Sequence, residues 1–248
     1  MENERMLMND YARILTDGIT NIAENQSEKM EEAATLLCDT LCHDGLIYVF
    51  GCGHSHMLAE ETFYRAGGLA CVYPLFNEPL MLHESASLSS HLERESGWAE
   101  KVLSPCVFGP HEALICVSTS GVNGVPVEVA AEARRRGVKV IGITSSAYDE
   151  DAPRNAENMH LWEVCDVWAD NAAPHGDACL QPVGLPVKMT PTSTVFSAFI
   201  INSMLAQAVQ MALARGVEPP VFLSGNIEGG HEYNRKLIER YKSRVPCL

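Results

Sequence analysis

The sequence predicts an α/β protein, a three-layer αβα sandwich with a five-stranded parallel sheet, preceded by two N-terminal helices. The expected strands are five short apolar runs: 46–50, 70–75, 113–118, 138–144 and one within 161–170. These runs alternate with segments of helical periodicity, and they stay apolar throughout instead of alternating with polar residues. Strands of this kind are buried on both faces, which is typical of a parallel sheet between two layers of helices.

Residues 1–45 are expected to form the two helices ahead of the sheet. One stripe with intervals of three and four residues marks the first helix: Tyr11, Ile14, Leu15, Gly18, Ile19 and Ile22. Ser27 is the expected N-cap of the second helix, and Asp44-Gly45 is its stop signal. The buried face of that helix is expected to hold Ala33, Ala34, Leu37 and Leu41.

Helical patterns recur between and after the strands. They run from the first strand's loop through Tyr64, near 92–103, over 126–136 and over 195–214. Residues 147–160 read as a polar loop within one domain, so we expect a single domain over 1–248. Its parts are the N-terminal helices (1–45), the α/β core (46–215) and a C-terminal segment at a subunit interface (216–248).

The charge balance excludes several classes of protein. Lys and Arg number 18 against 32 Asp and Glu, and a formal net charge of −14 repels nucleic acid and anionic membranes. The start of the chain is polar and acidic, unlike a signal peptide, and no apolar run approaches the roughly 20 residues of a membrane span. Nine cysteines without a Cys-x-x-Cys pair indicate reduced thiols, so we expect a cytoplasmic protein.

Small hydroxyl residues gather where the predicted strands end, which is where ligands bind in such sheets. The segments concerned are Gly51-Cys52-Gly53-His54-Ser55-His56, Ser118-Thr119-Ser120-Gly121-Val122-Asn123, Thr144-Ser145-Ser146 and Thr192-Ser193-Thr194. Hydroxyls and backbone N–H groups at helix N-termini bind phosphate well. Each segment alone is more often a helix cap without a ligand. Their repetition at one edge of the sheet predicts a phosphate site.

Neither common nucleotide-binding motif is present. The dinucleotide fingerprint G-x-G-x-x-G is broken at His56, and Tyr73-Pro74-Leu75 at the end of the second strand lacks the acidic residue that holds a ribose. The tripeptide Gly-Lys-Ser/Thr of a P-loop does not occur in the chain.

The first two of these loops resemble the phosphosugar-binding loops of the sugar isomerase (SIS) domain. Ser118-Thr119-Ser120-Gly121 is similar to the family's Ser-x-Ser-Gly, and the resemblance covers most of residues 30–215. Three longer stretches resemble a subgroup of stand-alone bacterial SIS proteins of uncharacterised reaction: VFGCGHSHMLAEETFYRAGGLA, HESASLSSHLERESG and VFLSGNIEGGHEYN. The resemblance implies homodimers or homotetramers with sites at the subunit interface.

The resemblance also implies the residues that hold the phosphate of a phosphorylated sugar. They are Ser55, in the loop that contains Gly53, together with Ser118, Thr119, Ser120 and Asn123. Ser145 and the turn formed by Thr192, Ser193 and Thr194 are weaker correspondences.

The catalytic carboxylate is not carried over directly, because Arg65 occupies the position ten residues after the loop serine where the family often has glutamate. Family isomerases use this carboxylate to move a proton between C1 and C2, and a histidine assists ring opening. We predict Glu84 as the base, assisted by His83 or by His56, although the same pair is also consistent with a solvated loop.

Other acidic groups remain open. Glu60 and Glu61 follow the first loop on the same helix, whereas Glu93-Arg94 is interpreted as a structural ion pair or cap. A metal site at His54, His56 and His83 is weighed and not predicted, because the helical spacing of HExxH is absent. No cofactor is expected.

The function predicted from these residues is an aldose–ketose isomerase that acts on a phosphorylated sugar. Two alternatives remain: an amino-sugar-phosphate lyase or etherase, and a phosphosugar sensor without catalysis.

Overall fold

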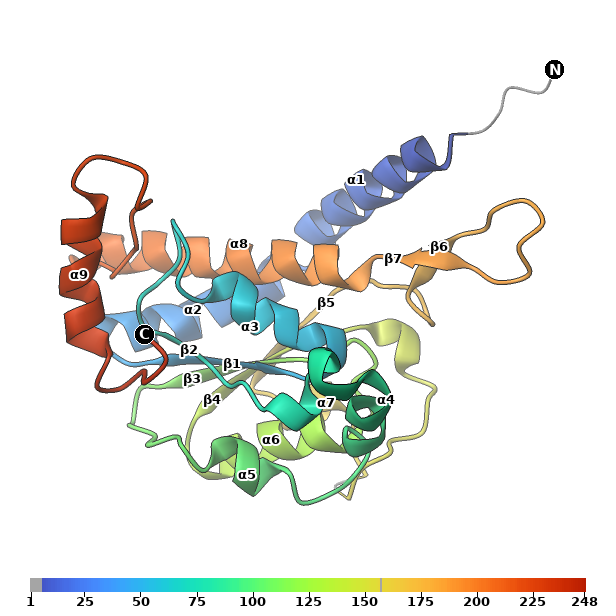
Figure 1. Cartoon of the computed structure of the whole chain (residues 1–248), viewed down its shortest axis with the longest axis horizontal. Helices are drawn as coiled ribbons and strands as arrows, with labels where there is room; N and C mark the ends of the chain where they lie inside the picture. The colour runs from blue at the N-terminus through green and yellow to red at the C-terminus, as the bar shows by residue number, and fades with distance from the viewer. Residues whose placement is uncertain (1–5, 157) are drawn as a thin grey trace.

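The structure is a computed structural model and describes residues 6–156 and 158–248. A five-stranded parallel sheet with the strand order β2-β1-β3-β4-β5 forms its centre (Figure 1). The strands are β1 (Ile47–Gly51), β2 (Val72–Pro74), β3 (Ala113–Val117), β4 (Lys139–Thr144) and β5 (Val167–Asp170). Every residue of β1, β2 and β3 is buried, as expected for strands covered on both faces. The predicted fold class is therefore confirmed.

Helices cover both faces of this sheet. On one side lie α2 (Ser27–Cys42) and α3 (Met57–Thr62), and α8 (Ser193–Ala214) packs on both of them (Figure 1). On the other side lie α5 (Ala99–Leu103), α6 (Gly124–Arg135) and α7 (Leu161–Val164). At one edge, α4 (Leu82–Leu92) contacts two 3₁₀ turns, η1 (Gly53–His56) and η2 (Glu78–Leu80).

The central strands β1 and β3 pair in register. Ile47 lies opposite Ala113, and Gly51 lies opposite Val117. Because the strands are parallel and unshifted, the loops that follow them leave the sheet side by side at its carboxyl edge.

A hairpin and the first helix extend beyond the body of the protein at that end (Figure 1). The hairpin consists of β6 (Ala178–Leu180) and β7 (Met189–Pro191), and it was not predicted from the sequence. The first helix, α1 (Leu7–Asn25), touches it through the Tyr11 hydroxyl, which donates to the Pro191 carbonyl at 2.8 Å. Of the predicted apolar stripe on α1, Ile22 alone is fully buried.

The C-terminal segment is bound to the core of its own chain at the opposite end. Backbone hydrogen bonds join Phe222 to Gly67 and Gly68, each 2.8 Å long. The last helix, α9 (Gly230–Tyr241), then brings the Tyr241 hydroxyl within 2.7 Å of Asp44, which accepts its hydrogen bond. Asp44, at the predicted stop of the second helix, adopts a left-handed conformation with φ of 56°.

Three local expectations differ from the structure. The helix expected near 92–103 is two helices, because Gly97 adopts φ of 88° and donates its N–H to Glu128 at 2.8 Å. The first part of the run 161–170 is the short helix α7, which begins with a capping box between His160 and Glu163. Ser27 is the first residue of α2, and Gln26 occupies the N-cap.

One helix in the described ranges, α8, is long and apolar enough to cross a membrane by length and composition alone. The sequence of α8 contains no long unbroken apolar run, because polar residues such as Asn202 and Gln207 interrupt it. Its apolar residues pack on α2 and α3, and Phe196, Ile200 and Met204 are buried there. This packing accounts for its composition as a core helix.

Candidate functional site

A cavity of about 290 Å³ lies at the carboxyl edge of the sheet, between the loops that follow β1 and β3. Residues of η1, α4, the β3–α6 loop, the 3₁₀ turn η3 (Ser146–Tyr148) and the start of α8 line it. Eight of the predicted phosphate-binding residues are in the lining: Gly53, Ser55, Ser118, Thr119, Ser120, Asn123, Ser193 and Thr194. The fold thus brings together three of the four hydroxyl-rich segments that the sequence singled out.

Glycine at position 51 allows the turn η1 to fold back over the end of β1. A Cβ atom on Gly51 would lie 2.6 Å from the carbonyl oxygen of Ser55, which is closer than such atoms approach. The Ser55 N–H donates to the Cys52 carbonyl at 2.9 Å, and Gly53 adopts φ of 53°, a conformation that favours glycine. This tight turn puts Ser55 on the wall of the cavity.

The loop after β3 is fixed by β4. Gly121 has φ of 64°, and a Cβ atom there would lie 2.6 Å from the Thr144 hydroxyl. That hydroxyl donates to the Thr119 carbonyl at 3.3 Å, and the Ser118 hydroxyl accepts from the Gly121 N–H at 3.3 Å. The backbone of the loop is therefore held without help from the side chains of Thr119 and Ser120.

Five hydroxyl groups in the lining have no hydrogen-bond partner among the described residues. They belong to Ser55, Ser90, Thr119, Ser120 and Thr194. Because hydroxyls facing a cavity satisfy their hydrogen bonds with whatever occupies it, these five are available to a polar ligand. They come from four segments, which makes the cavity rich in neutral donors.

Asp177 occupies the N-terminus of α8. Its carboxylate accepts from the backbone N–H groups of Thr192 and Ser193 at 2.9 and 2.8 Å, and from the Ser193 hydroxyl at 2.6 Å. The Thr192 hydroxyl also donates to it at 3.3 Å, and Thr192 does not line the cavity. The positive end of the helix dipole is thus already neutralised by a protein carboxylate. The predicted phosphate roles of Thr192 and Ser193 have no support in these contacts.

Ser145 also has a structural role in place of its predicted one. It is completely buried, donates to the Ala173 carbonyl at 2.6 Å and accepts from the Ala147 N–H at 3.2 Å. Its side chain lies outside the lining of the cavity.

The carboxylates predicted on the helix after the first loop point elsewhere. His56 is buried, contacts the Gly53 carbonyl through Nδ1 and lies 3.6 Å from Glu60 through Nε2. Glu61 pairs with Arg65, the residue that replaces the family glutamate, and accepts from Asn202 on α8 at 3.2 Å. None of His56, Glu60 and Glu61 is in the described lining of the cavity.

His83 and Glu84 lie on the first turn of α4 and face solvent. Their side chains are 61% and 56% exposed, and their closest charged atoms are 3.7 Å apart. Ser85 interrupts the helix with φ of −164° and ψ of 107°, and Leu82 before it and Ser90 after it both line the cavity, whereas His83 and Glu84 do not. The solvated alternative therefore describes the pair, and the predicted catalytic roles have no support from its position.

Glu93, which the sequence analysis interpreted as part of a structural ion pair or cap, is a carboxylate of the cavity wall. It follows α4, lines the cavity and receives a hydrogen bond from the Asn123 side chain. Burial raises the pKa of the Glu93 carboxyl above its ordinary value, while Asn123 and the nearby Arg94 oppose that rise. Asn123 Oδ1 is buried without a partner among the described residues. A perturbed carboxyl beside an unsatisfied amide is a candidate for acid–base chemistry.

The cavity carries little positive charge. In the described lining there is no Lys or Arg, whereas Glu93 and Asp177 are both present, at its α4 and hairpin sides. Of the histidines weighed as a metal cluster, His54 lines the cavity and His83 does not. Any anion bound here would depend on hydroxyls and backbone N–H groups, near the β1 and β3 loops.

Comparison with known proteins identifies the family. The profile of the SIS domain matches residues 10–145. The chain belongs to the SIS domain family. A UPF0309 protein of Geobacillus kaustophilus is 41% identical over 243 residues, which are 98% of this chain and 97% of the relative. A UPF0309 protein of Thermoanaerobacter pseudethanolicus is 43% identical over 244 residues, which are 96% and 99% of the two chains.

A solved structure shares the fold of this SIS domain. The structure of a phosphoheptose isomerase from Francisella tularensis matches 82% of this chain and 96% of its own, with a TM-score of 0.54 and 14% identity. The resemblance predicted from the Gly51–His56 and Ser118–Gly121 loops is therefore confirmed at the level of family and fold.

Replacing Asp177 tests whether its carboxylate stabilises the start of α8 in this SIS domain. We expect Asp177→Ala to lower the free energy of unfolding by about 1–2 kcal/mol, as the loss of a helix-capping side chain does. Urea denaturation measures this change, with Asp149→Ala, at an exposed aspartate, as the control. Added sulfate should restore part of the loss in Asp177→Ala, because the vacated helix N-terminus attracts anions. Equal stabilities of the two variants would show that Asp177 contributes nothing there.

Proposed function

We propose that this SIS domain binds a phosphorylated sugar in the cavity at the carboxyl edge and interconverts its aldose and ketose forms. The observation that carries the proposal is the combination of five unpartnered hydroxyls with one partly buried carboxyl of raised pKa in the same cavity. The hydroxyls suit a phosphate and sugar hydroxyl groups, and the carboxyl suits proton transfer. The substrate class named for the Francisella tularensis isomerase agrees with this proposal.

The phosphate is proposed to lie against the loop after β3. Thr119 and Ser120 offer hydroxyls there, and Ser55 and Thr194 offer two more from the neighbouring segments. The two carboxylates of the lining, Glu93 and Asp177, would repel a phosphate, so the sugar carbon atoms rather than the phosphate should face Glu93.

Glu93 is proposed as the base, in place of Glu84. An aldose–ketose interconversion moves one proton between C1 and C2, and a single carboxylate can remove the proton from one carbon and return it to the other. A raised pKa improves a carboxylate for this work, because its basicity moves closer to the operating pH. His54 is the histidine in the lining that is available to assist ring opening.

The alternatives differ from the isomerase in what happens after binding. An amino-sugar-phosphate lyase or etherase would use Glu93 to remove a proton while a neighbouring substituent leaves, which forms a double bond, and water that then adds to this double bond would place solvent oxygen in the product. A sensor would bind the phosphosugar without changing it.

The first test is binding of a panel of hexose, pentose, heptose and amino-sugar phosphates, each compared with its free sugar. A ligand that binds the folded state raises the melting temperature. We expect a rise for one phosphosugar and none for its free sugar. Ser55→Ala combined with Ser120→Ala should weaken that affinity at least about tenfold, because each lost hydrogen bond to a charged group is worth about 1.5–3 kcal/mol.

Ser104→Ala is the matched control for this test, because Ser104 bonds only its own helix end. Neither Ser55 nor Ser120 uses its hydroxyl within the described fold, so the double variant should melt like the parent protein without ligand. A phosphosugar affinity that is the same in the double variant and in Ser104→Ala would contradict the phosphate site.

Glu93→Gln tests the base with the phosphosugar identified by that panel. We expect turnover to fall by about 10²–10⁴-fold with binding retained, as for the loss of a general base. In the parent protein, turnover should rise with pH through the raised pKa of Glu93, because only the ionised carboxylate accepts a proton. Glu84→Gln is the control, and it should keep full turnover. If Glu84→Gln loses turnover and Glu93→Gln keeps it, Glu84 is the base.

The same substitution has a stability readout that does not require a substrate. A carboxyl whose pKa is raised on folding favours the folded state at low pH, and this contribution is lost as pH rises through the folded pKa. Glu93→Gln should therefore gain stability over the parent at neutral pH and show no gain well below the ordinary carboxyl range. If Glu93→Gln is no more stable than the parent at neutral pH, folding does not raise the pKa of Glu93.

We also propose that the chain forms a homodimer or homotetramer through its projecting hairpin. The loop and second strand of the hairpin expose four apolar side chains: Val183, Leu185, Val187 and Met189. A projecting apolar surface of this kind is typical of an interface with a second copy of the chain. The proposal agrees with the subunit assembly that the family resemblance implied.

Light scattering after size exclusion measures this assembly. The parent protein should have a mass of two or four chains, and Val183→Asp with Val187→Asp should lower it, because buried unpaired charge disfavours the interface. Lys101→Asp, at an exposed lysine remote from the hairpin, controls for charge change. A monomeric parent would exclude the assembly, and an unchanged mass in the double variant would exclude this interface.

A further inference from the structure

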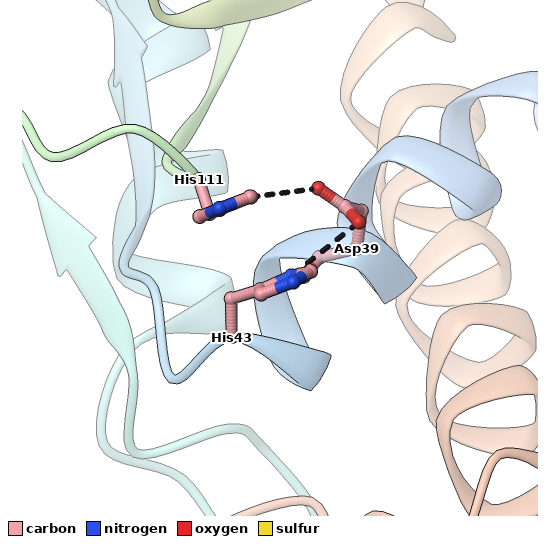
Figure 2. Close-up of side chains that lie close together, drawn as sticks. All are labelled: Asp39, His43 and His111. Carbon is pink, nitrogen blue, oxygen red and sulfur yellow. Dashed lines mark hydrogen bonds and ion pairs between the residues drawn. The ribbon is translucent and has the colours of Figure 1, made fainter.

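Three side chains with metal-binding chemistry meet at the amino edge of the sheet, opposite the cavity. Asp39 and His43 lie one turn apart at the end of α2, and His111 lies in the loop that leads into β3 (Figure 2). One ligand atom from each lies within 4.8 Å of the other two. The group is separate from the histidines that the sequence analysis weighed, and the inference does not rest on the proposed function.

The backbone holds the two segments together. Ala113 pairs with Ile47 in the sheet, so the loop before β3 starts beside the turn that ends α2. Gly45 in that turn permits the close approach, because a Cβ atom there would lie 2.4 Å from the His111 carbonyl oxygen. The positions of His43 and His111 are therefore set by the pairing of the two strands.

The side chains are already oriented by hydrogen bonds. His43 Nδ1 lies 2.8 Å from the Asp39 carbonyl oxygen, which only accepts, so Nδ1 carries the proton and Nε2 keeps its lone pair. A metal-ligating histidine is held in this way in many proteins, by a hydrogen bond from its other ring nitrogen. His111 Nδ1 lies 3.1 Å from the Asp39 carboxylate.

The two imidazole rings stack in parallel, with centroids 3.7 Å apart and an interplanar angle of 8° (Figure 2). Ligand atoms around a tetrahedral zinc ion lie about 3.3 Å apart, given bond lengths of about 2.0–2.1 Å. Because the three side chains are 40–50% exposed, small rotations suffice to bring their ligand atoms from within 4.8 Å to that spacing.

The end of α2 favours a cation through the helix dipole. Asp39 and His43 lie at the C-terminal end of a 16-residue helix, where the helix dipole is negative, and the last turn of α2 contains no basic residue. The formal net charge of the whole chain is −14.

We propose that Asp39, His43 and His111 bind one divalent transition-metal ion of the zinc type. Two imidazoles and one carboxylate are ligands that suit Zn²⁺, Co²⁺ and Ni²⁺, whereas Mg²⁺ and Ca²⁺ prefer oxygen alone. Three protein ligands leave a coordination position for water. The ion ties the end of α2 to the start of β3, and it stabilises the folded chain in proportion to its occupancy.

Cobalt binding to the full chain tests this site, since tetrahedral Co²⁺ absorbs visible light and reports its ligands. The protein carries Cys247→Ser, which removes an exposed thiol. A chelator first removes any bound metal, and the protein is then titrated with CoCl₂. We expect one Co²⁺ per chain, displaced by Zn²⁺, and a rise in melting temperature with either ion. His43→Ala, His111→Ala and Asp39→Asn should each weaken binding at least about tenfold, since even outer-shell changes cost 10–100-fold.

His91→Ala is the matched control, because His91 and Glu95 form a pair with the same helical spacing, 3.2 Å apart, but no third ligand among the described residues. It should bind cobalt like the parent. His43→Gln and His111→Gln keep side-chain size, and melting without metal checks that every variant folds. Three results would each overturn the proposal. The first is that no stoichiometric visible band forms, and the second is that a sulfur-to-cobalt charge-transfer band appears. The third is that the ligand variants bind cobalt as tightly as His91→Ala does.

Discussion

The in-register parallel pairing of β1 with β3 is the constraint on which both ends of this molecule depend. Each backbone N–H and C=O in these buried strands needs a partner, because an unpaired buried group costs about 1–3 kcal/mol. With Ile47 opposite Ala113 and Gly51 opposite Val117, no shift of register is possible without exposing such groups. The same ladder therefore brings the loop that contains Ser55 beside the loop that starts at Ser118, and, at the other edge, the turn after α2 beside the loop that contains His111.

The cavity is built from hydroxyls and backbone rather than from fixed cations. Asp177 already neutralises the N-terminus of α8, so the polar character of the wall comes largely from the unpartnered hydroxyls of Ser55, Ser90, Thr119, Ser120 and Thr194. Glu93 sits among them with a raised pKa, because burial removes the water that would otherwise stabilise its charge. The site thus offers a ligand neutral hydroxyl donors and the partly desolvated carboxyl of Glu93.

Strands and loops were predictable from the sequence, and side-chain direction was not. The apolar runs gave the strand positions to within a residue or two, and Ser55 and Ser120 follow from where β1 and β3 end. Glu93 gave no such signal, because its burial depends on contact between the end of α4 and the start of α6, where Val125 N–H donates to the Glu93 carbonyl at 3.0 Å. His83 and Glu84 were favoured by the sequence, but both side chains lie mostly in solvent, which sequence spacing does not show.

The contact between α1 and the hairpin connects the first helix to the cavity. Tyr11 on α1 donates to the Pro191 carbonyl, and Pro191 is followed directly by Thr192, whose N–H donates to Asp177 in the cavity lining. If fixing α1 changes ligand affinity by some factor, the ligand must change the binding of whatever fixes α1 by the same factor.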